Sequence, residues 1–336
     1  MKKGLLKAAY SSQVWNFFHP LGKNRLMVLN YHRINDPYSD NFSDFVPNVS
    51  ATPKLFASQM DYLLSRGFNF ISQGDLIAWL DNRIPLPPYA VLVTFDDGYA
   101  DNYSNAFPIL KQRNIPATIF LSVDHIGTSK PFYWDLVSYC LYQSPFKEKN
   151  LPLLGIRSWE EKDQWVKVAD DFVRELKGLP ENEKKELLFT IPDILEVKVK
   201  NADFEGKHLN WDQVKEMSKG LITFGGHTRS HPILTQINIK KVLDEVMGSK
   251  IKIEKELGYP VESMAYPNGG ERDFSPEIMA VVEKAGYKIA FSLIDGYTQY
   301  RNLNQMRFQL RRIYLGRNDL LPRFAAKVNP ITMWIK

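Results

Sequence analysis

Short apolar runs alternate with amphipathic segments along most of this 336-residue chain, and no other feature restricts its fold as strongly. The run Val91–Phe95 shows no polar alternation, as expected of a parallel strand that is buried on both faces. Further strands are predicted over Arg25–His32, Ala117–Ser122, Leu221–Gly225, Ser263–Tyr266, Lys288–Ser292 and Gln309–Leu315. Helical periodicity predicts helices over Pro53–Arg66, Gln73–Leu80, Tyr103–Arg113, Trp211–Lys219, Ile239–Leu257 and Ser275–Ala285. About seven strand–helix alternations favour an α/β fold with a closed or nearly closed barrel, and a doubly wound open sheet is the alternative.

One region interrupts this rhythm. Between about residues 130 and 207 no strand is predicted, but Trp165, Val168, Phe172 and Leu176 recur at helical spacing among charged residues. The pattern predicts a helical insertion that forms a lid, a partner surface or a subdomain without a separate role. The last is favoured because surface loops accept insertions readily. The expected organisation is an N-terminal amphipathic segment over 1–25, the barrel over 26–129 and 208–317, the insertion over 130–207 and a C-terminal tail over 318–336.

The composition is that of an ordinary globular protein, with 44% apolar and 24% charged residues. No apolar stretch approaches the ~18 residues of a membrane-spanning helix. The net charge of +5 is small and no basic stripe with interleaved aromatic residues is present, so no nucleic-acid partner is expected. The single cysteine, Cys140, leaves no internal disulfide and suits a cytoplasmic protein.

The first residues combine lysines with an apolar helical face. Their apolar core is interrupted at Lys7 and is shorter than the ~7–15 residues of a signal peptide, so the segment is expected to be retained. One helical face carries Leu6, Tyr10, Val14, Phe17 and Phe18. This pattern is compatible with peripheral contact with a membrane surface, and packing onto the barrel is the favoured alternative.

Two adjacent carboxylates, Asp96 and Asp97, follow the predicted strand Val91–Phe95. Like charges this close raise one pKa unless an ion or a catalytic role compensates them. Because the chain is expected to turn at Gly98, both side chains can point into one cavity at the C-terminal end of the strand. A simple Asp-Gly turn is the alternative explanation.

Two histidines, His227 and His231, lie four positions apart after the predicted strand Leu221–Gly225. On a helical turn this spacing places both imidazoles on one face, where they can bind one metal ion. Exposed or capping histidines are the alternative. Since this stretch and the aspartate pair both follow strands, they are expected on the same rim of the barrel. Two histidines and one carboxylate form the three-ligand open site of hydrolytic zinc enzymes.

These two stretches, Thr94–Gly98 and His227–His231, resemble the first two motifs of the polysaccharide deacetylases (NodB-homology domain, carbohydrate esterase family 4), TFDDG and H-S/T-x-x-H. The stretch Ala265–Gly269 resembles the third motif in its Tyr-Pro-x-Gly form. The resemblance covers roughly residues 26–127 and 210–315. It implies a distorted (β/α) barrel of about seven parallel strands that holds a divalent metal, usually zinc.

The resemblance also implies roles for the motif residues. Asp97, His227 and His231 would bind the metal, and Asp96 would be the general base. A metal lowers the pKa of bound water from about 15.7 toward about 7, which supplies the nucleophile that an acetamide requires. The backbone N–H of Tyr99 is the candidate donor to the oxyanion, and an acid must protonate the departing amine. Zinc is the expected cofactor, although such sites also accept cobalt, nickel and iron.

Two positions depart from the family pattern. Ala265 replaces the arginine that usually precedes the proline of the third motif by two residues, and Arg312, on a strand-like alternation, is the candidate to supply this guanidinium. The Leu-x-His motif near the C-terminus is missing, because no histidine follows His231. His32, at the end of the first predicted strand, is therefore the candidate acid or substrate contact. An exposed strand arginine and a structural histidine are the respective alternatives.

The resemblance implies a metal-dependent hydrolase that removes N-acetyl groups from an N-acetylhexosamine-containing polysaccharide or glycoconjugate. A catalytically silent barrel that binds carbohydrate is the alternative, favoured by the missing arginine and histidine motifs. The residues expected to contact the sugar are Tyr99, Trp134, Tyr266 and Pro267. Motifs for nucleotide binding and for a serine nucleophile are absent from the sequence, which argues against those chemistries.

Overall fold

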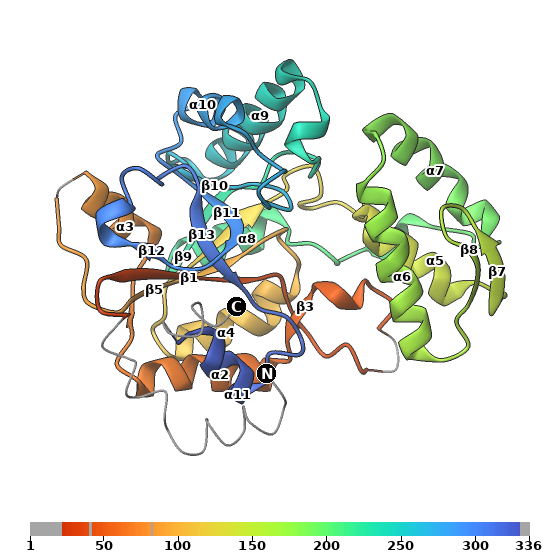
Figure 1. Ribbon diagram of the computed structural model, residues 1–336, viewed down its shortest axis with the longest axis horizontal. Coiled ribbons are helices and arrows are strands. Elements are labelled where there is room, and N and C mark those ends of the chain that lie inside the picture. The colour runs from red at the N-terminus through yellow and green to blue at the C-terminus, as the bar shows by residue number, and fades with distance from the viewer. Residues whose placement is uncertain (1–21, 40–41, 82, 330–336) are drawn as a thin grey trace.

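The computed structural model describes residues 22–39, 42–81 and 83–329. Within these residues, seven parallel strands form a closed barrel: β1 (Arg25–Tyr31), β5 (Ala90–Phe95), β6 (Ala117–Leu121), β9 (Ile222–Gly226), β10 (Ser263–Ala265), β11 (Ile289–Asp295) and β13 (Leu310–Tyr314). Their order is β1-β13-β11-β10-β9-β6-β5, and pairing of β1 with β5 closes the ring (Figure 1). The predicted barrel of seven parallel strands is confirmed, and each strand lies where an apolar run predicts one.

The barrel is distorted around β10, which has three residues and pairs with β9 at Met264 and Gly226. The register between β11 and β13 also shifts between Phe291 and Asp295. Two short strands extend the sheet beyond the ring: β4 (Asn69–Phe70) runs parallel to β5, and β12 (Thr298–Gln299) runs antiparallel to β1. A separate parallel pair is formed by β2 (Arg33–Ile34) and β3 (Val49–Ala51).

Helices surround the barrel: α2 (Pro53–Ser65), α3 (Gln73–Leu80), α4 (Phe107–Gln112), α8 (Trp211–Ser218), α9 (Ile239–Leu257), α10 (Pro276–Lys284) and α11 (Leu321–Lys327). Five of them start after a side chain that accepts a hydrogen bond from the backbone three residues on: Thr52, Ser72, Asn210, Asn238 and Ser275. The helix predicted from Tyr103 starts differently, because a π-helical turn at Asn102–Ala106 precedes α4. Short 3₁₀ turns complete the connections: Val46–Asn48, Asn201–Phe204, Leu234–Gln236 and Tyr300–Asn302.

Alternate residues along the strands pack on opposite sides of the barrel wall. Val28, Leu92 and Phe120 belong to one buried cluster, whereas Val91 and Val93 belong to the larger cluster that also contains residues of the surrounding helices. Because side chains alternate along a strand, Arg312 shares the side of β13 that Leu310 occupies in the first cluster. On this side of β13, the side chains therefore change from apolar at Leu310 to polar at Arg312, toward the C-terminal end of the strand.

The insertion consists of α5 (Tyr133–Gln143), β7 (Glu148–Leu151), β8 (Gly155–Ser158), α6 (Lys162–Lys177) and α7 (Glu181–Ile194), grouped at the right of Figure 1. Trp165, Val168, Phe172 and Leu176 are buried along α6, as their spacing predicts. Their cluster also includes Phe45 and Tyr99 from the barrel segments. The antiparallel hairpin of β7 and β8 corrects the prediction of an insertion without strands. Its residues are mostly exposed and polar, so they carry no apolar alternation that would indicate a strand.

The two ends of the chain were predicted as an amphipathic segment and a tail. Residues 1–21 lie outside the described residues, so the membrane contact predicted for them stays a prediction. The region predicted as a tail contains α11, whose fully buried Phe324 ring contacts Tyr62 of α2 at 6.0 Å between centroids. No helix in the described part of the chain is both long enough and apolar enough to cross a membrane.

Candidate active site

The aspartate pair lies where β5 ends and the chain turns sharply. Asp97 has φ +79° and Gly98 has φ +83°, so two successive residues adopt a left-handed conformation. A Cβ atom at Gly98 would come within 2.7 Å of Ile126 Cδ1, which explains why glycine stands there. The turn sends the two carboxylates to different partners, since Asp96 meets an arginine and Asp97 meets two histidines.

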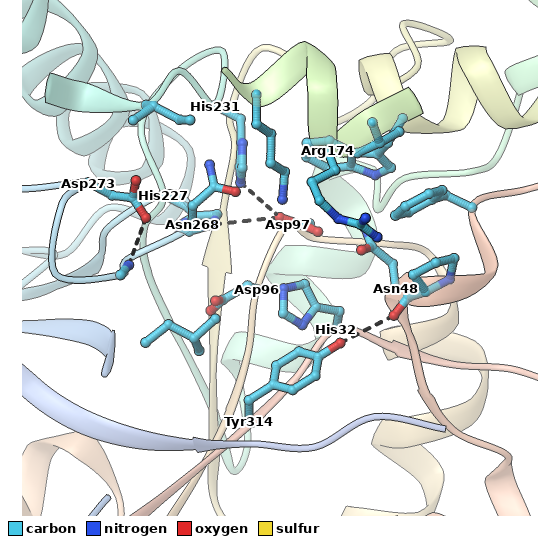
Figure 2. Close-up of a pocket in the computed structure, with 18 of the residues that line it drawn as sticks. His32, Asn48, Asp96, Asp97, Arg174, His227, His231, Asn268, Asp273 and Tyr314 are labelled. Atoms are coloured by element: carbon cyan, nitrogen blue, oxygen red, sulfur yellow. Dashed lines mark hydrogen bonds and ion pairs between the residues drawn. The ribbon is translucent and has the colours of Figure 1, made fainter. Parts of the chain in front are cut away.

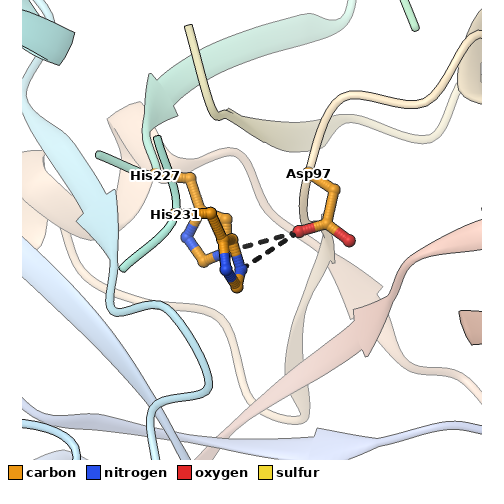
Figure 3. A group of neighbouring side chains, drawn as sticks. All are labelled: Asp97, His227 and His231. Atoms are coloured by element: carbon orange, nitrogen blue, oxygen red, sulfur yellow. Dashed lines mark ion pairs between the residues drawn. The ribbon is translucent and has the colours of Figure 1, made fainter. Parts of the chain in front are cut away.

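Asp97, His227 and His231 come together in the arrangement that a metal ion requires (Figure 3). Asp97 Oδ1 lies 3.5 Å from His227 Nε2 and 3.4 Å from His231 Nε2, and a ligand atom of each residue lies within 4.8 Å of the others. Neither carboxylate oxygen of Asp97 has a hydrogen-bonding partner among the described residues. Buried oxygens without partners are costly, so this donor set fits a divalent cation.

The two imidazoles are held in different ways. His227 Nδ1 lies 2.8 Å from the carbonyl oxygen of Ala265, which fixes the ring and leaves Nε2 facing Asp97. His231 Nδ1 has no hydrogen-bonding partner within the described residues. Burial lowers the pKa of His231 to about 3 and favours its neutral form, which is the form that binds metals.

The histidine pair does not lie on a helical turn, contrary to the prediction. The chain from β9 into this stretch is a loop in which Thr228 has φ +64° and His231 has φ +62°. The Thr228 hydroxyl accepts a hydrogen bond from the His231 backbone N–H at 3.1 Å. A loop stabilised by its own side chain thus brings the two imidazoles together, with ring centroids 4.8 Å apart.

Arg312 lies against Asp96, the position for which it was proposed. Its Nη1 and Nη2 donate to Asp96 Oδ1 and Oδ2 at 2.7 and 2.8 Å, and Asn30 donates to Oδ2 at 2.9 Å. Both Arg312 and Asp96 are buried. Burial would raise the pKa of Asp96, but the charge of Arg312 and its hydrogen bonds hold this pKa below its ordinary value. A guanidinium on β13 therefore lies beside Asp96, as predicted for Arg312.

His32 follows β1 and lines the same cavity as both aspartates. Its backbone is fixed on both sides, because its N–H donates to Ser50 and its carbonyl accepts from Asn102. Its Nδ1 has no hydrogen-bonding partner among the described residues. Burial lowers the pKa of His32, while the charges of Asp97 and Asp96 act in the opposite direction. Figure 2 shows its ring beside these two carboxylates.

The cavity around these residues has a volume of about 820 Å³. Its walls come from the strand ends of the barrel, from the loop after β10 and from α6 of the insertion (Figure 2). In the loop after β10, Asn268 and Gly269 both have positive φ, and a Cβ at Gly269 would lie 2.8 Å from the backbone nitrogen of Leu293. This close approach explains the glycine of the third motif.

Of the four residues predicted to contact the sugar, Trp134 alone is among the described residues that line the cavity. The Tyr266 ring is fully buried, stacks on Phe274 at 4.6 Å and donates its hydroxyl hydrogen to the Phe308 carbonyl. Pro267 is buried beside it. Both side chains follow β10 and are buried, and neither lines the cavity, so the contact with the sugar predicted for them stays a prediction.

Tyr99 is also buried away from the cavity, so its ring does not contact a substrate there. Its hydroxyl lies between Trp134 Nε1 and Asp135 Oδ2, at 2.7 and 2.6 Å. The backbones at Tyr99 and His208 run antiparallel and are joined by two hydrogen bonds on either side of this pair. Ala100 N–H donates to the Lys207 carbonyl, and Leu209 N–H donates to the Gly98 carbonyl. These two bonds do not use the Tyr99 N–H, which stays the candidate donor to an oxyanion.

Sequence reasoning missed the wall that α6 provides. The cavity-lining residues on this helix are Asp170, Val173, Arg174 and Lys177. Their spacing of three, one and three positions places them on one face, beside the buried face that was predicted. The signal was present in the sequence, but charged residues on an amphipathic helix are ordinarily solvated, so nothing singled them out.

Comparisons with known proteins agree with this fold. A family model described as polysaccharide deacetylase matches residues 83–148 and 169–290, which is more than half of the chain. Three solved structures cover about nine-tenths of it: the Streptococcus pyogenes deacetylase PplD in complex with acetate (TM-score 0.59, 20% identity, 91% of this chain and 99% of that chain), a de-N-acetylase from Aggregatibacter actinomycetemcomitans (0.57, 17%, 90% and 100%) and IcaB from Ammonifex degensii (0.52, 21%, 90% and 97%). At these identities the likeness shows the fold.

Two curated relatives are poly-beta-1,6-N-acetyl-D-glucosamine N-deacetylases. Those of Staphylococcus epidermidis and Staphylococcus aureus are 35% and 31% identical to this chain over 123 residues. The match covers 34% of this chain and 42% of each relative, so it spans less than half of their length. The family match, the seven-stranded barrel and the sequence motifs agree, and the chain belongs to the polysaccharide deacetylase family.

Proposed function

We propose that this protein is a metal-dependent carbohydrate N-deacetylase acting on an N-acetylglucosamine-containing glycan. The observation that carries the proposal is the juxtaposition of two groups in one cavity. One is the Asp97, His227 and His231 cluster, and the other is the buried Asp96–Arg312 pair. The names of the curated relatives support the substrate class, and the donor set supports zinc as the ion.

The reaction replaces the C–N bond of an acetamide with a C–O bond to water and yields acetate and a free amine. A bound divalent ion supplies Lewis-acid chemistry, because it lowers the pKa of water at its open position and polarises a carbonyl oxygen. Asp96 would accept the proton that water loses as it attacks the acyl carbon. Arg312 keeps Asp96 ionised and oriented before the attack, through its two hydrogen bonds.

Two further groups would complete the reaction. The Tyr99 N–H, at the turn after Asp97, would donate a hydrogen bond to the oxyanion. His32, which lines the cavity beside both aspartates, would deliver a proton to the departing amine. These two roles follow from position, and neither depends on the Leu-x-His motif that the sequence lacks. The Asp96–Arg312 pair also argues against a silent binding protein, since the missing motif arginine was one of the two reasons to consider one.

The first test measures acetate release from N-acetylglucosamine oligomers with β-1,4 and β-1,6 linkages, for the zinc-loaded wild type and for Asp96→Asn. The wild type should release acetate, and loss of the base should lower kcat by about 10²- to 10⁴-fold. Zinc affinity should persist in Asp96→Asn because Asp97 and both histidines remain. Asp61→Asn, which alters an exposed carboxylate on α2, is the matched control and should keep wild-type activity. A wild type that binds zinc but deacetylates no amino sugar would contradict the proposal.

A further inference from the structure

The imidazole of His231 lacks the hydrogen bond that normally orients a metal-binding histidine. His227 has such a bond through Nδ1 to the Ala265 carbonyl, whereas His231 Nδ1 has no partner among the described residues. A partner on the second ring nitrogen is what usually fixes the tautomer and the ring orientation. Some other contact must therefore hold His231 in place.

Aromatic residues from the start of the insertion supply this contact. The Trp134 ring meets the His231 ring edge-on, with centroids 4.9 Å apart and planes at 77°. Phe132 approaches the same imidazole at 5.6 Å and 75°, and it stacks on Trp134 at 4.5 Å and 10°. Edge-to-face pairs at these distances are attractive and restrict ring rotation. The insertion thus packs directly against one of the three candidate metal ligands.

Trp134 is itself fixed by a buried hydrogen-bond chain. Its Nε1–H donates to the Tyr99 hydroxyl oxygen at 2.7 Å, and this hydroxyl donates to Asp135 Oδ2 at 2.6 Å. Asp135 Oδ1 accepts the Phe45 N–H at 3.1 Å. All of these side-chain atoms are buried, so loss of one hydroxyl would leave two polar groups without partners. Tyr99 lies two residues after Asp97, which ties the chain to the ligand turn as well.

We propose that Trp134 is a positioning residue that holds the His231 imidazole in its ligating orientation, and that Tyr99 and Asp135 lock Trp134 for this purpose. The insertion then has a defined task at the metal centre, beyond forming a wall of the cavity. This inference rests on the metal site of the proposed function. It does not depend on the identity of the glycan.

The test measures the zinc affinity of the full chain by competition with a chromophoric chelator, together with the melting temperature of the metal-free protein. Tyr99→Phe removes the bridging hydroxyl but keeps the ring and the backbone N–H. We expect zinc affinity to fall by about 10-fold or more, as when an outer hydrogen-bonding partner of a ligand is lost. Tyr103→Phe makes the same chemical change at a hydroxyl that bonds Glu216, and it should leave zinc affinity unchanged.

A second comparison separates positioning of His231 from a general loss of structure. In a His231→Ala background, Tyr99→Phe should have no further effect on zinc affinity, because the imidazole that it orients is absent. Asp135→Asn retains an oxygen acceptor for the Tyr99 hydroxyl, so it should lower the affinity less than Tyr99→Phe does. Trp134→Phe, which removes the indole N–H, should resemble Tyr99→Phe.

Two results would overturn the inference. One is unchanged zinc affinity in folded Tyr99→Phe and Trp134→Phe, even with a lower melting temperature, since that describes a structural role. The other is an equal loss of affinity with and without His231. Because these measurements use zinc alone, they stand apart from the deacetylase test, which fails when a zinc-loaded wild type releases no acetate.

Discussion

Arg312 is a fully buried cation, and the Asp96 carboxylate compensates its charge. Both of its terminal nitrogens donate to Asp96, and its Nε donates to the Ser292 carbonyl at 2.8 Å. Burying such a pair is expensive, and the cost is offset where each nitrogen of the guanidinium donates to an acceptor at 2.7–2.8 Å, as here. The arginine therefore couples the stability of the barrel to the ionisation of the proposed base.

Removal of this arginine should damage stability and catalysis together. Arg312→Met leaves Asp96 buried without its counterion, which raises the pKa of Asp96 and should lower the free energy of unfolding by about 3–5 kcal/mol. Urea denaturation at neutral pH measures the loss. Arg311→Met, at the neighbouring partly exposed position of β13, is the control and should change stability little. If Arg312→Met is as stable as this control, the Asp96–Arg312 pair does not stabilise the folded protein as predicted.

At the scale of secondary-structure elements, α6 has two faces with different tasks. Trp165, Val168 and Phe172 lie in the core of the insertion, while Arg174 and Lys177 line the cavity. The end of the helix contacts the 3₁₀ turn Leu234–Gln236 that follows His231, because Gln236 Nε2 donates to the Lys177 carbonyl at 2.8 Å. Burial lowers the pKa of the Lys177 ammonium, although the charges of Asp273 and Asp97 oppose this. The helix thus presents a hydrogen-bond donor close to the proposed reaction centre.

Lys177→Met should weaken substrate binding and spare the metal site. Loss of a hydrogen bond from a charged donor is worth about 1.5–3 kcal/mol, which corresponds to a decrease of roughly 10- to 100-fold in kcat/KM. The decrease should appear mainly in KM, measured by acetate release from an N-acetylglucosamine oligomer. Lys167→Met, on an exposed position of the same helix, is the matched control. Identical kinetics for the two variants would show that α6 does not contact the substrate.

At the scale of the whole molecule, buried imidazoles link folding to acid pH. Burial lowers the pKa of His125 to about 4 and that of His208 to about 3. Neither ring nitrogen of His208 has a hydrogen-bonding partner in the described part of the chain, and its ring lies 5.5 Å from Tyr99 and 5.1 Å from Phe132. Such a site favours the neutral ring, whereas the unfolded chain protonates its histidines near pH 6.5.

The free energy of unfolding is expected to decrease as the pH is lowered below about 6.5. Above pH 6.5 both states carry neutral imidazoles and stability is at its full value, and below it only the unfolded state gains protons until the folded pKa is reached. Stability is therefore lost as pH falls from about 6.5 toward 3–4, by about 1.4 kcal/mol per pH unit for each such histidine. His208→Phe should reduce the slope of the unfolding free energy against pH by the contribution of one histidine, about 1.4 kcal/mol per pH unit. Urea denaturation of both proteins between pH 4.5 and 7 measures this difference. Parallel curves would contradict this account.

The sequence by itself determined the barrel and the two motifs. Strands such as β5 are short apolar runs, and their periodicity is a local property that needs no tertiary contact to be read. The spacing of His227 and His231 and the aspartate pair before a glycine are local as well, and the resemblance of these stretches to the family motifs singled out Asp97 as the third candidate metal ligand. The helical conformation expected for the histidine pair was wrong because i, i+4 spacing also suits a tight loop.

Only the tertiary structure decided which distant residues meet. Arg312 reaches Asp96 across 216 positions because ring closure brings β13 and β5 to either side of β1. Packing between elements likewise buries Tyr266 in the core and Tyr99 against the insertion, and it places Trp134 and α6 at the cavity. Periodicity specifies which face of an element is apolar, but contacts between elements depend on how all of them pack at once. Local patterns therefore identified residues at the strand ends of the cavity but did not show that α6 forms one of its walls.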